Sequence, residues 1–157
     1  ISVNGTDIRQ LWPALYDRIG VVLQDAFLFD DTLLQNITLY RPELRERVEP
    51  VLRSLGMDAF LASNDLEQAF QNTKGNLSGG ERQKLALARV LIEDKSVIFL
   101  DEATANMDKD SSQKILSQLL QTAGLTVISI EHKVSPELLP LYDQILELKD
   151  AHLVERV

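Results

Sequence analysis

Three short apolar runs constrain the fold of this 157-residue chain more than any other feature of its sequence. They are rich in β-branched residues and read IGVVL (19–23), SVIFL (96–100) and LTVISI (125–130). Uninterrupted runs of this kind are typical of strands that are buried on both faces of a parallel sheet. Helical patterns over 78–92 and 109–121 separate the runs. This alternation of strands and helices predicts an α/β fold with a mostly parallel sheet.

The first of these helices begins at a glycine pair in the segment NLSGGERQK (76–84). Ser78 and Glu81 have the spacing of a capping box, so the helix should begin at Gly79 or Gly80. Unpaired N–H groups and the positive end of the helix dipole favour an anion there, and glycines let an oxyanion approach the backbone. The segment therefore predicts either a phosphate-binding helix start or an ordinary capped helix after a glycine-rich turn.

Both helices carry an apolar face that predicts burial in the core. In the first helix this face consists of Leu85, Ala88 and Ile92, widened by Leu87 and Leu91. In the second it consists of Ile115, Leu116, Leu119 and Leu120. Asp108 or Asp110 can cap the second helix. Near the end of the chain, DQILELKD and AHLVERV predict an antiparallel hairpin with a tight turn at Asp150.

Composition excludes several classes of function. A formal charge of −8 argues against a nucleic-acid-binding surface, which needs clustered Lys and Arg. The absence of cysteine excludes a disulfide framework and a thiolate metal site, and the cytoplasm is the default compartment. No run has the pattern of a signal peptide or the roughly 18 apolar residues of a membrane span, so any membrane crossing is expected in another chain or a missing segment.

Polar residues follow each of the three predicted strands. Gln24 comes after the first, Asp101 and Glu102 after the second, and Glu131 and His132 after the third. Ligands of open α/β sheets bind beyond the carboxyl ends of the strands, so these groups should converge at one edge. Singly, each would be read as a turn residue, a helix cap or a solvated side chain. Together they predict a phosphate site.

These side chains suit nucleotide hydrolysis, which needs positioning and charge neutralisation more than covalent catalysis. Asp101 suits a hard cation such as Mg²⁺, and Gln24 could contact the metal or the attacking water. Glu102 could act as the general base on that water. His132 could donate a hydrogen bond to the γ-phosphate. The sequence contains no GxxxxGK[ST] loop that would hold the β- and γ-phosphates.

NLSGGERQKLALARVLI, followed by VIFLDEATANMD, resembles the nucleotide-binding domain of ABC ATPases. LSGGE is similar to the family signature, VIFLDE to the Walker B strand with its catalytic glutamate, and ANMD to the D-loop. Gln24 resembles the Q-loop glutamine and His132 the switch histidine. ISVNGTDI resembles part of the family's first antiparallel sheet, and LQDAFLFDDTLLQNI resembles the exporter branch. The similarity extends over nearly the whole chain.

The resemblance implies a P-loop NTPase-like ABC ATPase domain with a helical subdomain. Residues 1–24 and 78–157 would belong to the ATPase core, and 25–77 would form a helical subdomain that contacts transmembrane domains. The implied function is ATP hydrolysis coupled to export, with ATP and Mg²⁺ bound at the cytoplasmic face of the cell membrane. Family members pair head to tail, so the signature would contact a nucleotide held by a second ABC ATPase domain. The residues expected to bind the nucleotide are Ser78, Gly79, Gly80, Glu81 and Asp108.

Two departures from the family pattern bear directly on the expected phosphate site. Because the phosphate loop is missing, the chain is expected to be an N-terminally truncated domain without the first strands and the adenine contact, inactive in isolation. Glu131 stands in EHK where exporters often have AHR, which brings a second carboxylate close to the expected γ-phosphate.

The sequence is also compatible with two other functions. One is a catalytically incompetent pairing module that offers its signature face to a complete partner. The other is a soluble ABC ATPase of the DNA-repair type, although the interval between Gln24 and Ser78 has no sustained heptads.

Overall fold

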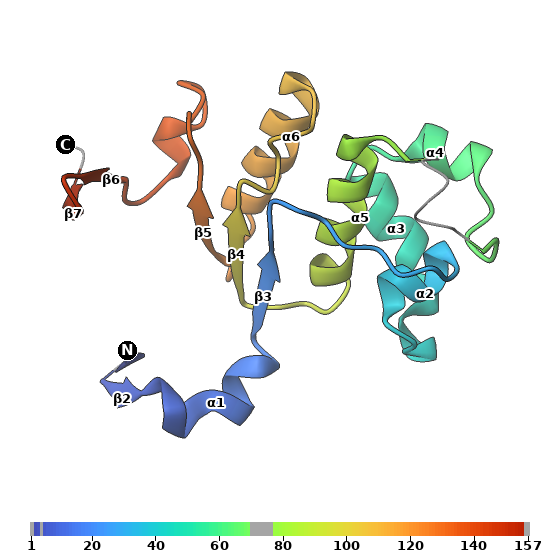
Figure 1. Ribbon diagram of the computed structural model, residues 1–157, viewed down its shortest axis with the longest axis horizontal. Helices are drawn as coiled ribbons and strands as arrows, with labels where there is room; N and C mark the ends of the chain where they lie inside the picture. The colour runs from blue at the N-terminus through green and yellow to red at the C-terminus, as the bar shows by residue number, and fades with distance from the viewer. Residues whose placement is uncertain (1, 4, 70–76, 156–157) are drawn as a thin grey trace.

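The computed structural model describes residues 2–3, 5–69 and 77–155 (Figure 1). At its centre lies a parallel sheet of β3 (Ile19–Val22), β4 (Val97–Asp101) and β5 (Thr126–Ile130), in the order β3-β4-β5. Val21, Phe99 and Ile128 lie side by side in its register. The three predicted strands, and the α/β class, are therefore confirmed.

A group of helices between β3 and β4 lies to one side of the sheet (Figure 1). It comprises α2 (Leu33–Thr38), the 3₁₀-helix η1 (Pro42–Arg47), α3 (Val48–Ser54) and α4 (Asp58–Ser63). Helices α2 and α3 pack against α5 (Gly79–Leu91), which in turn packs against β3. The second predicted helix is α6 (Lys109–Leu120), which follows β4 and contacts β5. Both helices thus form where the sequence predicts them.

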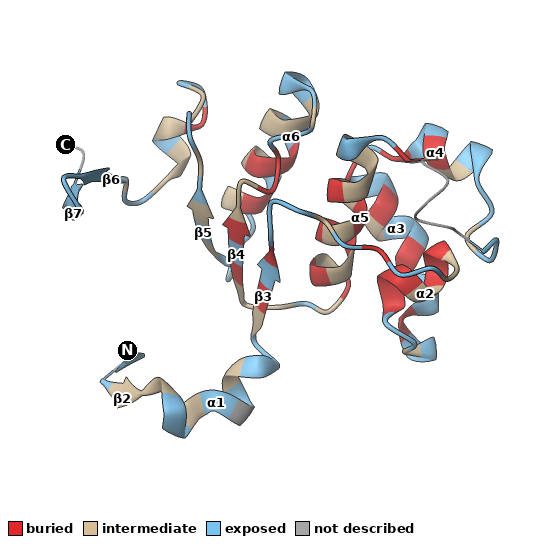
Figure 2. Ribbon diagram, in the orientation of Figure 1, coloured by how far each residue is buried: buried red, intermediate tan, exposed pale blue. Residues whose placement is uncertain are grey.

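The core lies between the sheet and the helices α5 and α6, and it continues between α5 and the helices α2 and α3 (Figure 2). On α5, Leu85, Leu87 and Ala88 are fully buried, as expected for its apolar face. On α6, Ile115, Leu116 and Leu119 are buried, whereas Leu120 is only partly so. At this interface β3 approaches α5 so closely that a Cβ on Gly20 would lie 2.1 Å from Cγ1 of Val90.

Burial of the strands on both faces was a wrong prediction. Val22, Ile98 and Leu100 are buried on the helix-covered face, but Val21 is 53% and Ile128 45% exposed on the other. Among the described residues, α5 and α6 cover one face only, so burial alternates along β3 and β4. The apolar residues of the second face give the strands their uninterrupted pattern without being buried here.

Two small antiparallel pairs lie at the chain's ends. β1 (Ser2–Val3) pairs with β2 (Thr6–Asp7), followed by α1 (Ile8–Tyr16), whereas Ile1 and Asn4 lie outside the described residues. Beyond the 3₁₀-helix η3 (Leu139–Leu141), β6 (Leu146–Lys149) pairs with β7 (His152–Glu155).

The C-terminal hairpin is confirmed, and its turn involves both Asp150 and Ala151, with φ of 47° and 60°. In the described part of the chain β6 and β7 form a sheet of their own. None of the described helices combines the length and apolarity that a membrane span requires.

The close approach of β3 and α5 predicts that Gly20→Ala destabilises the fold by about 1–3 kcal/mol, because the added methyl group meets Val90. Urea denaturation would measure this loss. A Val90→Ala background removes the Cγ1 atom and leaves the Val90 Cβ at 3.3 Å, so the same substitution should cost much less there. An equal cost in both backgrounds would contradict this explanation.

Candidate functional site

Glu102 is the centre of a polar cluster at the carboxyl ends of the sheet strands. The side-chain amide of Gln24, which follows β3, donates from Nε2 to Glu102 Oε2 over 2.9 Å. Nε2 of His132, which follows β5, lies 2.8 Å from Glu102 Oε1. We call Gln24, Glu102 and His132 the strand-edge cluster. The structure thus brings these three predicted residues together, each from a different strand end.

The backbone of Glu102 has an unusual conformation. Its φ of 47° lies in the left-handed region, which is uncommon for a residue other than glycine. The Glu102 N–H donates to the carbonyl of Ile130 over 3.0 Å, which fixes this turn against the end of β5. Strained residues of this kind are concentrated at functional sites, where the surrounding structure holds them in place.

Asp101 is the last residue of β4 and lies opposite Ile130 in the register. Together with the Gln24 amide it provides oxygen donors at neighbouring strand ends, the chemistry that Mg²⁺ prefers. No group of three His, Cys, Asp or Glu residues in the described segments could hold a metal. This partial donor set fits Mg²⁺, which typically takes one or two protein ligands and completes its shell with phosphate oxygens and water.

Glu131 places a second carboxyl beside the strand-edge cluster. Its Oε1 is buried and has no hydrogen-bond partner among the described residues. Burial, and next the negative charge of Glu102, raise the pKa of the Glu131 carboxyl above its ordinary value, and His132 opposes this shift. Glu131 is therefore partly buried and biased toward its neutral form.

The predicted capping box is present at the start of α5. Ser78 Oγ accepts a hydrogen bond from the Glu81 N–H at 3.2 Å, and the Ser78 N–H donates to Glu81 Oε2 at 2.7 Å. A hollow of about 250 Å³ lies beside this turn, and we call it the cap hollow. It is lined by Ser78, Gly79, Gly80, Glu81, Lys84, Asn106, Met107 and Asp108. All five residues predicted to contact the nucleotide therefore line one hollow. Asn76, the first residue of the predicted segment, lies outside the described residues.

The glycines of the cap hollow also have a packing role that the sequence did not indicate. A Cβ on Gly79 would lie 3.1 Å from the Cβ of Asn106, and one on Gly80 would lie 3.1 Å from the Asn106 carbonyl oxygen. The first turn of α5 therefore lies directly against the loop that follows Glu102. Asp108, rather than Asp110, caps α6 by accepting from the Ser111 N–H at 2.9 Å, and this hydrogen bond lowers the pKa of Asp108.

Gln83 was missed at the sequence level. It is only 1% exposed, and its amide bonds to the backbone of Gln24, Glu102 and Asn106. The sequence did contain a signal for this role, because Gln83 lies one turn before Leu87 on the apolar face of α5. A polar side chain on a buried face must find hydrogen-bond partners, and here it finds them in the functional loops.

Arg89 is the second residue that sequence reasoning missed. Its guanidinium donates to the carbonyls of Phe27 and Asn36 and, over 2.8 Å, to Asn36 Oδ1. It also lies 5.4 Å from the ring centroid of Phe29. Burial lowers the pKa of Arg89. The Arg89 side chain therefore holds the segment after Gln24 against α5.

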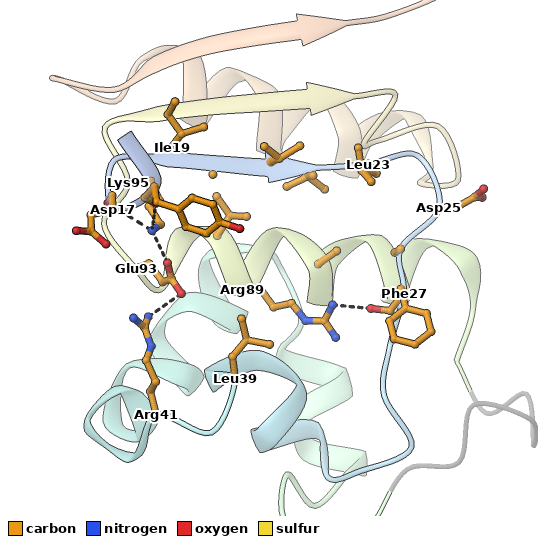
Figure 3. Close-up of a pocket in the computed structure, with 17 residues that line it drawn as sticks. Asp17, Ile19, Leu23, Asp25, Phe27, Leu39, Arg41, Arg89, Glu93 and Lys95 are labelled. Atoms are coloured by element: carbon orange, nitrogen blue, oxygen red, sulfur yellow. Dashed lines mark hydrogen bonds and ion pairs between the residues drawn. The ribbon is translucent and has the colours of Figure 1, made fainter. Parts of the chain in front are cut away.

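We call the group of helices α2, η1, α3 and α4 the helical segment. A groove of about 490 Å³ runs along β3 and α5 beside this segment (Figure 3). Phe27 and Leu39, which are 62% and 41% exposed, line it together with Leu23. Elsewhere along the groove, Glu93 pairs with Arg41 at 2.7 Å and with Lys95 at 2.6 Å (Figure 3). The groove therefore combines exposed apolar side chains with a wall of paired charges.

A parallel α/β sheet with a polar cluster at its strand ends and a capped glycine helix start defines a domain of the nucleotide-binding class. The family model described as "ABC transporter" matches residues 1–105. The chain belongs to the ABC transporter family.

Two relatives and one solved structure illustrate this membership. The chain is 37% identical over 161 residues to human ATP-binding cassette sub-family B member 6, with 99% of the chain covered. It is 31% identical over 163 residues to an ATP-dependent lipid A-core flippase of Neisseria meningitidis, again with 99% covered. A bacterial Atm1-family ABC exporter solved with ATP bound matches 98% of the chain with a TM-score of 0.84 at 31% identity. The domain is thus the ATP-binding domain of an exporter-type ABC transporter, as the sequence predicted.

The chain spans only a part of these relatives. It covers 19% of the human protein, 26% of the flippase and 27% of the solved exporter.

The raised pKa of Glu131 predicts a pH-dependent stability. The folded state holds this proton more tightly, so the contribution of Glu131 is fully present below its unfolded pKa of about 4.5 and is lost as the pH rises through the folded value. Glu131→Gln should therefore raise the melting temperature by roughly 1–4 °C at pH 8 and by almost nothing near pH 4. Thermal denaturation across this range would measure the difference.

Glu147→Gln on the exposed β6 strand is a suitable control, because it alters a carboxyl that is half exposed and paired only with a solvent-exposed lysine, Lys149, among the described residues. If both variants change the melting temperature alike at pH 8, burial of Glu131 is not the cause.

Proposed function

We propose that this domain binds and hydrolyses ATP and that the hydrolysis drives export through associated transmembrane domains. The observation that carries the proposal is the convergence of Gln24 and His132 on the Glu102 carboxylate. Each residue follows a different strand of the parallel sheet, at the edge where α/β domains bind their ligands.

In this proposal Glu102 is the general base. Its carboxylate would accept the proton of the water that attacks the γ-phosphate, while the Gln24 amide, already bonded to Glu102, orients that water. His132, whose side chain is 85% exposed, can turn from Glu102 toward the phosphate and donate a hydrogen bond from its ring. Mg²⁺, which Asp101 and Gln24 would hold, supplies charge neutralisation at the phosphate oxygens when bound.

We also propose that the domain pairs with a second ABC ATPase domain. The cap hollow offers the N–H groups of α5 beside Ser78, Gly79 and Gly80, and Lys84 adds a positive charge. The hollow lies at the N-terminus of α5, apart from the strand-edge cluster at the sheet. This arrangement suits a triphosphate held by the partner, whose signature helix would in turn serve the nucleotide at Glu102.

The groove is the surface that we assign to the transmembrane domains. Residues 25–77 would form the helical subdomain, of which 70–76 lie outside the described residues. Leu39 and Phe27 offer an apolar surface to a cytoplasmic loop of those domains, and Arg41 and Glu93 offer charges at its rim. The domain would then work at the cytoplasmic face of the membrane.

The proposed chemistry predicts that Glu102→Gln, made in the full-length protein, slows ATP hydrolysis by about 10²–10⁴-fold. ATP binding should persist, because the amide keeps the shape of the carboxylate while losing only its basicity. Steady-state phosphate release and equilibrium nucleotide binding would measure the two effects. Glu147→Gln on the exposed β6 strand is the matched control. Unchanged turnover in Glu102→Gln would remove this residue from the role of base, and a full-length protein without any hydrolysis would favour a pairing module.

Contact between the groove and a transmembrane domain predicts protection at Leu39. In the full-length protein in membranes, Leu39→Cys should react with a bulky maleimide several-fold more slowly than Glu147→Cys. Each rate would be normalised to that of the denatured protein, and peptide mass spectrometry would identify the labelled site. Both positions are exposed in this domain, so equal normalised rates would mean that nothing covers the groove.

A further inference from the structure

Gln83 has a side-chain amide whose donors and acceptor are all used within the protein. Its Nε2 donates to the Gln24 carbonyl over 3.3 Å and to the Glu102 carbonyl over 3.4 Å. Its Oε1 accepts a hydrogen bond from the Asn106 N–H over 2.9 Å. A primary amide has two donor hydrogens, so one buried side chain serves three backbone groups at once.

The three backbone groups belong to the segments that carry the proposed chemistry. Gln24 follows β3, whereas Glu102 and Asn106 belong to the loop after β4. Gln83 itself lies on α5, about one turn beyond the glycines of the cap hollow. It therefore joins the helix start to Gln24 and Glu102, two of the three residues of the strand-edge cluster.

Packing reinforces this connection. The first turn of α5 lies against Asn106 so closely that a Cβ on Gly79 or Gly80 would require Asn106 to shift by a few tenths of an ångström. A shift of the α5 N-terminus must therefore move this loop or break the hydrogen bond from Asn106 to Gln83. The left-handed backbone of Glu102 is held on both sides, by the bond from its N–H to Ile130 and by the bond from Gln83 to its carbonyl.

We infer that Gln83 is a positioning residue that fixes Gln24 and Glu102 relative to the start of α5, and so couples ligand occupancy of the cap hollow to hydrolysis at the strand-edge cluster. This inference rests on the proposed function, in which the cap hollow serves a partner's nucleotide. Among the described residues, the hydrogen bonds of the Gln83 side chain all join backbone groups, so it acts through Gln24 and Glu102 and not on the phosphate itself.

Gln83→Met in the full-length protein tests the inference, because methionine has a similar length and no amide. The kcat per folded molecule should fall by about tenfold to a hundredfold, since small displacements of catalytic groups have effects of this size. The KM for ATP should change by less than about twofold, because the residues that would contact the phosphates are intact. The Hill coefficient for ATP should fall toward 1 as the two sites lose their coupling.

Gln83→Asn is a second variant in case methionine is not tolerated beside the polar backbone groups. It keeps a buried amide, but it is one methylene shorter and cannot reach all three partners, so the same pattern of kcat, KM and Hill coefficient is expected. Gln118→Met, on the exposed side of α6, is the control for the chemical change. The folded fraction of each variant would be determined by gel filtration and circular dichroism.

A purely structural role would lower the folded fraction and leave the kcat per folded molecule and the Hill coefficient at their unsubstituted values. That result in either variant, or a Hill coefficient of 1 in the unsubstituted protein, would overturn the inference. Failure of the proposed function would be seen separately, as an unsubstituted full-length protein that does not hydrolyse ATP.

Discussion

The burial of α5 between the sheet and the helical segment is the constraint on which the rest of the architecture depends. Leu85, Leu87 and Ile92 are fully excluded from solvent, and the helix touches β3 on one side and α2 and α3 on the other. Burial of this extent supplies most of the stability of a small domain. One helix thereby connects the strand ends, the helical segment and the glycine turn at Ser78, so these parts cannot be placed independently.

Much of the fold was readable from local patterns. The β-branched runs predicted the parallel strands, and Ser78 with Glu81 predicted the start of α5 to within one residue, because a capping box is decided by near neighbours in sequence. The convergence of Gln24, Glu102 and His132 also followed, since parallel strands bring their carboxyl ends to one edge. The resemblance to ABC ATPases, carried by LSGGE and VIFLDE, added the family.

What the sequence did not reveal depends on contacts between distant segments. The exposure of Val21 and Ile128 could not be read from their strands, because an apolar residue looks the same whether or not another element covers it. The packing of Gly79 on Asn106 and the bonds of Gln83 join residues more than 15 positions apart. The left-handed backbone of Glu102 has no local signature either, since glutamate does not favour that conformation.

Arg89 has a consequence for how the segment after Gln24 can move. One guanidinium holds the carbonyls of Phe27 and Asn36 and the Asn36 side chain, and it does so where partial burial has already removed some of its water. Charged hydrogen bonds in such surroundings cannot be released one at a time without leaving a desolvated cation poorly paired. Detachment of this segment from α5 would therefore be abrupt, a single concerted step with two end states, and not a gradual loosening.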